Sequence, residues 1–130
     1  MVTFVSLAAV AMHGIGHILF LGPALGFASW GSTHSWILTG LAGDGPTRAI
    51  AAVVWTSSGV LFLAGVAGFM AQADWWRAAT LAAAIISLAG TIAYWDGIKQ
   101  PSGAAALLFN LLVLWALIVA RWPASTAIGS

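Results

Sequence analysis

The stretch VTFVSLAAVAMHGIGHILFLG, residues 2–22, decides the fold of this chain. It contains no Asp, Glu, Lys or Arg and is long enough to cross a bilayer core, which takes about 20 residues at a rise of 1.5 Å each. A secretory signal peptide would instead begin with positive charge and have a shorter apolar core. We therefore expect a retained membrane-spanning helix.

The composition of the whole chain agrees with this expectation. Of its 130 residues, 62% are hydrophobic and only 5% are charged, whereas a soluble domain carries about a quarter charged residues. The mean hydropathy is +1.02. We expect one transmembrane domain over residues 1–130, embedded in a lipid bilayer. A net charge of +1 gives no basis for nucleic-acid binding, and the lack of cysteine excludes disulfides and thiolate metal sites.

Glycine, proline and charge divide the chain into four spans. They cover about residues 2–22, 46–71, 75–95 and 103–122. Asp44 and Asp74 are expected to cap the second and third spans, and all charged residues fall at or beyond the span ends. The predicted fold class is all-α: an integral membrane up-down four-helix bundle with a long interfacial connection between the first two spans.

That connection, residues 23–45, is too apolar for an ordinary solvated loop. Its aromatic residues Phe27, Trp30 and Trp36 favour a segment lying on or dipping into the membrane interface. In the predicted topology, Arg77 and Arg121 share the face of the two termini, and Arg48 and Lys99 share the opposite face.

His13 and His17 are the polar residues of the first span that most need an explanation. Four residues apart, they lie on one face of a helix, about 13 Å and 8 Å from its end near Gly22. An imidazole that faced lipid at this depth would leave its nitrogens unpaired, so we expect both rings to face the bundle interior. Asn110 and the hydroxyls of the second span, Thr56, Ser57 and Ser58, are candidate partners.

Several uses fit this pair. A neutral histidine could be an axial ligand of haem or a chlorin, with Gly14 or Gly16 leaving room for the macrocycle and Asn110 beside it. The pair could join a third ligand on a divalent metal, or it could relay protons. Alternatively, each ring simply hydrogen-bonds to a neighbouring span.

The predicted topology also gathers polar residues at one mouth of the bundle. His34, Asp44 and Asp96 are expected there, with His17 the nearer of the two buried histidines. Nitrogen and carboxylate ligands of this kind suit zinc, so these four residues form a candidate metal site. The other interpretation is that Asp44 caps a helix, Asp96 pairs with a cation and His34 faces water.

The chain resembles a group of small, uncharacterised four-span bacterial membrane proteins, described as hypothetical or permease-like. The shared elements are His13-Gly14-x-x-His17, Trp75-Trp76-Arg77, Trp95-Asp96 and Asn110-Leu111. The resemblance implies the four-span architecture and a place in the bacterial inner membrane, and it implies no reaction.

Three functions remain in view. The favoured one is a non-enzymatic subunit or accessory protein that packs against other membrane subunits or further copies of itself. The second is a membrane protein that binds haem, a chlorin or a metal through His13 and His17. The third is a membrane enzyme or transporter with its polar site at the mouth formed by His34, Asp44 and Asp96.

Overall fold

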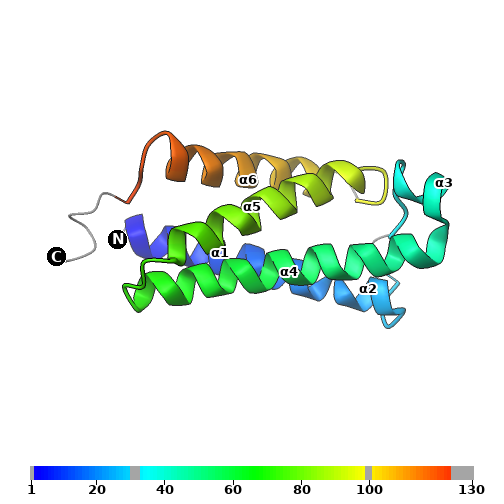
Figure 1. The fold of residues 1–130 in the computed structure, drawn as a ribbon, viewed down its shortest axis with the longest axis horizontal. Helices are drawn as coiled ribbons and strands as arrows, with labels where there is room; N and C mark the ends of the chain where they lie inside the picture. Colours follow the sequence, from blue (N-terminus) through cyan, green and yellow to red (C-terminus); the bar gives the residue numbers. More distant parts are fainter. Residues whose placement is uncertain (1, 30–32, 99–100, 124–130) are drawn as a thin grey trace.

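The structure is a computed structural model that describes residues 2–29, 33–98 and 101–123. Trp30 and Lys99 therefore lie outside the described residues. Within them the chain is all-helical, without a strand, as predicted. The helices are α1 (Val2–Leu19), α2 (Leu21–Leu25), α3 (Leu38–Ala42), α4 (Asp44–Met70), α5 (Trp76–Ala93) and α6 (Ser102–Ile118) (Figure 1).

The first predicted span is broken near its end into α1 and the short α2. Pro23 has no N–H to donate to the carbonyl of Leu19, and its ring crowds that carbonyl, so α1 ends there. The helix α2 then ends at Gly26, whose φ of 82° closes the turn in a left-handed conformation that glycine adopts without strain. Together, Thr3–Leu25 still form an apolar segment of 23 residues.

The helices α4 and α5 begin and end within two residues of their predicted bounds. The predicted caps are wrong, however. Gly43 and Trp75 hold the N-cap positions, and neither makes a side-chain cap bond. Asp44 is instead the first residue of α4, where its charge still meets the positive end of the helix dipole.

Three helical segments are long and apolar enough to cross a membrane: Thr3–Leu25, Asp44–Met70 and Trp76–Ala93. The fourth, α6, is apolar but has only 17 residues and ends at Ile118, four residues before the predicted end. The chain leaves the helix there, with Arg121 at a φ of 49° and the amide of Trp122 bonded back to Ala116 O.

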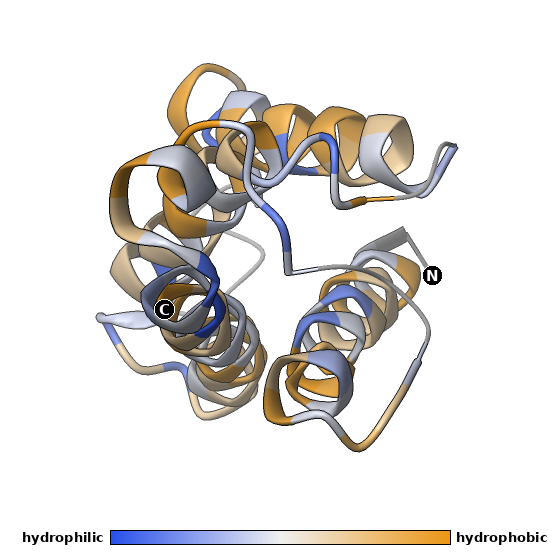
Figure 2. Cartoon of the chain, turned by 90° about the vertical axis from the view of Figure 1, so that its right-hand side faces the viewer, coloured by the Kyte–Doolittle hydropathy of each residue, from blue (hydrophilic) through white to orange (hydrophobic). Residues whose placement is uncertain are grey.

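The four longer helices alternate in direction, and both ends of the described chain lie at the same end of the molecule (Figure 1). The packed pairs are α1 with α4, α4 with α5, and α5 with α6. Within the described residues, α1 and α6 have no comparable contact. The four longer helices therefore pack as an open row in the order α1, α4, α5, α6, and the two outer helices do not close the bundle. Hydrophobic residues occur along all of these helices (Figure 2).

A pair of glycines allows α1 and α4 to cross closely. A Cβ added to Gly59 would lie 2.6 Å from Gly14 O and 2.7 Å from Ile18 Cγ1. A Cβ on Gly14 would likewise meet the Cβ of Phe62 at 2.9 Å. This close approach places the inner face of α1, which carries both histidines, directly against α4.

Candidate functional site

Both histidines of α1 lie on one face of the helix, as their spacing predicts, and that face is turned to the interior, as expected for imidazoles at this depth. His17 is buried, and His13, one turn earlier, is half-buried. Their rings pack edge to face with centroids 4.4 Å apart. We call the group formed by His13, His17, Ser87 and Asn110 the polar core.

Aromatic side chains surround the two imidazoles. The ring of His17 stacks on Trp55, with centroids 5.1 Å apart and 24° between the planes. His13 packs against Phe62 and Phe109, at centroid distances of 5.2 and 4.2 Å. These contacts hold both rings in place from α4 and α6.

Ser87 joins three helices through its single hydroxyl group. His17 Nε2 on α1 lies 2.7 Å from Ser87 Oγ on α5, and Asn110 on α6 donates its Nδ2–H to the same oxygen, also at 2.7 Å. Because Ser87 accepts from Asn110, its own proton is available for His17 Nε2. This assignment makes His17 a neutral ring protonated on Nδ1. All three side chains are buried.

Two buried polar atoms of the polar core have no hydrogen-bond partner among the described residues: His13 Nε2 and Asn110 Oδ1. The two side chains are neighbours. One atom can carry a proton and the other can only accept one. A hydrogen bond between these two atoms would complete the bonding within the polar core.

The hydroxyls of the predicted second span do not bond to the histidines, and Thr56 Oγ1 has no hydrogen-bond partner among the described residues. Ser57 bonds back to Val54 O in its own helix, and Ser58 donates to Ala83 O across the α4–α5 contact. The partner on α5, Ser87, is the one that sequence reasoning missed. Its signal was the buried series on α5 at helical spacing: Trp76, Thr80, Ala83, Ala84, Ser87, Gly90 and Thr91.

The two glycines expected to make room for a macrocycle have other environments. Gly14 is buried against α4, whereas a Cβ on the exposed Gly16 would have nothing within 4 Å. Phe109 already covers His13. The space near the histidines is thus occupied by protein side chains.

The predicted metal-site residues are only partly brought together. His34 Nδ1–H donates to Asp96 Oδ2 at 2.5 Å, and both side chains are exposed. Asp44 is exposed at the start of α4, and His17 belongs to the polar core. No group of three or more His, Asp or Glu side chains placed to hold a metal ion occurs in the part of the chain that the structure describes. Metal binding by these four residues stays a prediction.

The ionisation of Asp96 is set by its neighbours. Desolvation tends to raise the pKa of this carboxyl group, but the hydrogen bond from His34 and that from the amide of Trp36 outweigh it. The pKa of Asp96 therefore lies below its ordinary value.

The connection before α3 also caps α5. Ser35 Oγ donates to Ala93 O at 2.5 Å, and Trp36 Nε1 donates to Ile92 O at 2.8 Å. Carbonyls in the last turn of a helix have no partner within the helix, so these two bonds satisfy them. The connection for which an interfacial location is expected thus also has a structural role.

Comparison of the chain with protein-family models, with curated proteins and with solved structures finds no match.

Proposed function

We propose that the chain is a small integral membrane protein acting as a non-enzymatic subunit or accessory protein of a membrane assembly. In this proposal the polar core is an internal clamp that fixes α1, α5 and α6. The observation that carries the proposal is the bridge from His17 through Ser87 to Asn110. It pairs the buried Nε2 of His17 with α5 and, through the same hydroxyl group, connects it to α6.

Exposed side chains support the membrane location. Large apolar residues are exposed on each of the longer helices, among them Phe4, Val53, Ile85 and Leu112, at 77, 68, 56 and 62%. Water would disfavour so much exposed apolar surface, whereas lipid tails would not.

The described charges lie near helix ends. The 27 residues of α4 exceed the length needed to cross a bilayer, so Asp44 and Arg48 in its first turns can reach the headgroup region. Arg77 is at the start of α5, and Asp96 and Arg121 follow α5 and α6. We include α6 among the spans, with Val119 and Ala120 extending its apolar length.

Labelling can test this topology because the chain contains no cysteine. Single variants Asp74→Cys and Asp44→Cys place one thiol each at opposite ends of α4. In sealed membrane vesicles, an impermeant maleimide should label one variant before lysis and the other only after lysis. A protein released from membranes by alkaline carbonate, or equal labelling of both variants from outside, would contradict the proposal.

The cofactor-binding alternative has one observation in its favour, the unpartnered Nε2 of His13. Against it, His17 Nε2 already has a partner and Phe109 covers His13. An absorption spectrum and elemental analysis of protein purified from its native host would decide between the two. Visible absorbance or stoichiometric metal that is lost in His13→Ala would favour the cofactor-binding protein.

A further inference from the structure

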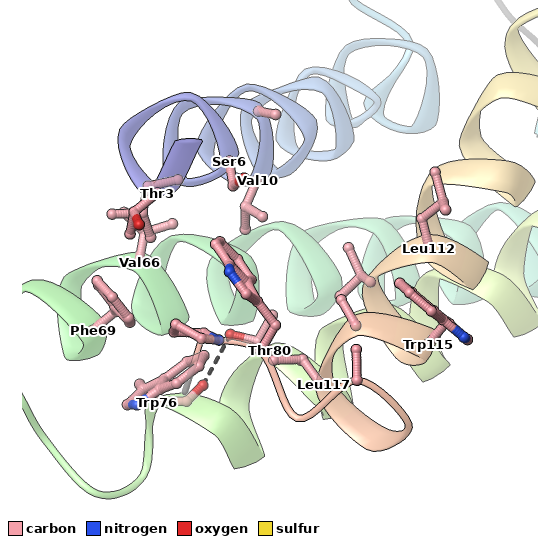
Figure 3. A pocket seen from close by; sticks show the side chains of 18 of the residues that line it. Thr3, Ser6, Val10, Val66, Phe69, Trp76, Thr80, Leu112, Trp115 and Leu117 are labelled. Atoms are coloured by element: carbon pink, nitrogen blue, oxygen red, sulfur yellow. Dashed lines mark hydrogen bonds between the residues drawn. The ribbon is translucent and has the colours of Figure 1, made fainter. Parts of the chain in front are cut away.

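A cavity of about 490 Å³ lies at the end of the molecule where both termini are found. Side chains from four helices converge on it (Figure 3), including Val10 on α1, Val66 on α4, Thr80 on α5 and Leu117 on α6. Its lining is almost entirely apolar, and its volume is within the range of about 300–1,000 Å³ typical of ligand sites. It is separate from the polar core, since neither histidine of α1 lines it.

The cavity exists because the row of helices is open. Helices α1 and α6 both pack toward the middle of the row but have no comparable contact with each other in the described part of the chain. Apolar groups from both helices, such as Leu7 and Val113, therefore border a space that no described side chain fills. In a bilayer, this space opens toward lipid.

The size of the cavity selects between two kinds of apolar occupant. A helix about 10 Å across would fill 490 Å³ within about 6 Å of its length, little more than one turn. A partner helix could therefore enter the cavity over only about one turn unless α1 and α6 separated further. A hydrocarbon chain is far thinner, since its carbon atoms approach their neighbours to about 4 Å. The space accordingly fits one chain of a lipid.

The residues at the mouth of the cavity indicate which kind of lipid headgroup would lie there. Trp76 and Trp122 line this end, as aromatic residues do at membrane interfaces. Arg77 donates to the carbonyls of Leu117, Arg121 and Pro123, and its guanidinium lies 5.2 Å from the centroid of the Trp76 ring. None of these partners carries a negative charge.

The guanidinium of Arg121 adds a second positive charge at this end, where the described residues include one carboxylate side chain, that of Asp74. Among the described residues, the ion pair found is that of His34 and Asp96, at the other end of the molecule. An anionic phosphate at this mouth would be attracted to the two arginines.

We propose that the cavity between α1 and α6 binds one acyl chain of an anionic phospholipid, whose phosphate lies against Arg121. This inference depends on the proposed membrane location. The phospholipid would close the open side of the helix row and complete the packing between α1 and α6.

Native mass spectrometry of the full chain in detergent can test the acyl-chain site. Delipidated protein is mixed with phosphatidylglycerol, and the bound lipid is counted. One lipid per chain should be retained. Ala9→Phe, which fills the cavity from α1, should weaken retention at least about tenfold, the loss expected when two methylene groups no longer fit. Ala8→Phe is the matched control, since Ala8 is also exposed on α1 but does not line the cavity.

A second pair of variants tests the same site from α6, so that the result does not depend on changes in α1 alone. Ala116→Phe fills the cavity from α6 and should weaken retention, whereas Ala105→Phe, exposed on the same helix and outside the cavity, should not. Arg121→Gln should remove the preference for phosphatidylglycerol over phosphatidylcholine of equal chain length while chain binding persists. Circular dichroism confirms that each variant is folded.

Several outcomes would overturn this inference. They are no retained lipid in the parent protein, equal retention in Ala9→Phe and Ala8→Phe, or a dimer cross-linked through residues of the cavity, which would assign the space to a second copy. None of these depends on the vesicle-labelling experiment. A chain that fails to span the membrane is therefore distinguishable from a spanning chain that lacks the lipid site.

Discussion

His17 Nε2 and Ser87 Oγ lie 2.7 Å apart, although 70 positions separate the two residues in the chain. Through this contact the first long helix is bonded to the third, and Asn110 adds the last helix at the same oxygen. The two helices flanking the open side, α1 and α6, are thereby connected through α5. The polar core thus provides part of the stabilisation that direct packing between α1 and α6 would provide.

Removing the shared hydroxyl should destabilise the protein. Ser87→Ala leaves the buried His17 Nε2 and Asn110 Nδ2 without a partner, and we expect a loss of about 1–2 kcal/mol in the free energy of unfolding. Reversible unfolding in mixed micelles measures it. Ser57→Ala is the matched control, because that hydroxyl bonds within its own helix. Equal losses in the two variants would count against the clamp.

Substitution by alanine should have opposite effects at one glycine of α1 and one glycine of α4. Gly59→Ala forces a methyl group against Gly14 O and should cost about 1–3 kcal/mol. Gly16→Ala enters open space and should stabilise the helix by up to about 1 kcal/mol. The same unfolding assay compares them. A tolerated Gly59→Ala would contradict the close crossing of α1 and α4.

Acid should release the connection before α3 from the end of α5. Because the pKa of Asp96 is lowered in the folded protein, its contribution to stability is present above the ordinary carboxyl pKa of about 3.9 and is lost as pH falls through the lower folded value. Hydrogen exchange of the Trp36 amide, which donates to Asp96 Oδ1, should accelerate relative to exchange of the α5 amides as that carboxyl is protonated.

Asp96→Asn supplies the control for this titration. Its amide oxygen can still accept from Trp36 but does not ionise in this range. The relative exchange rate should then be independent of pH. A Trp36 amide equally protected above and below the titration of Asp96 in the parent protein would rule out this role for the carboxylate.

Arg77 should hold the end of α6. Its guanidinium donates to Leu117 O, Arg121 O and Pro123 O, a set that the single ammonium of lysine cannot reproduce in the same geometry. We expect Arg77→Lys to raise hydrogen exchange selectively in the last turn of α6 and beyond, while Arg48→Lys leaves it unchanged. Unaltered exchange in Arg77→Lys would show that the three bonds contribute little.

Much of the fold follows from periodicity and composition. The bounds of α4 and α5, the inward face of His13 and His17, and the placement of charges near helix ends were all predictable, because the membrane-length apolar runs are long and uniform. The break before α2 was harder to predict, since Pro23 acts on a carbonyl four residues earlier in a run that is otherwise continuous.

The partners of the polar core could not be predicted in the same way. A helix places Ser57, Ser58 and Ser87 at comparable depths, and only the rotation of each helix decides which hydroxyl meets His17. Close approach of glycines, such as Gly14 to Gly59, sets that rotation, and it depends on tertiary packing. The spacing of small and hydroxyl residues on α5 was nevertheless a usable signal for its buried face.

A double-mutant cycle on His17 and Ser87 tests the central claim most directly. Unfolding free energies of the parent protein, His17→Ala, Ser87→Ala and the double variant are measured in lipid bicelles. If α1 and α5 span the membrane as proposed, a bond between them predicts a coupling energy of about 0.6–1.7 kcal/mol, the range for hydrogen bonds between membrane helices. Strictly additive losses would contradict the account, because they would mean that the two side chains do not stabilise the protein through each other.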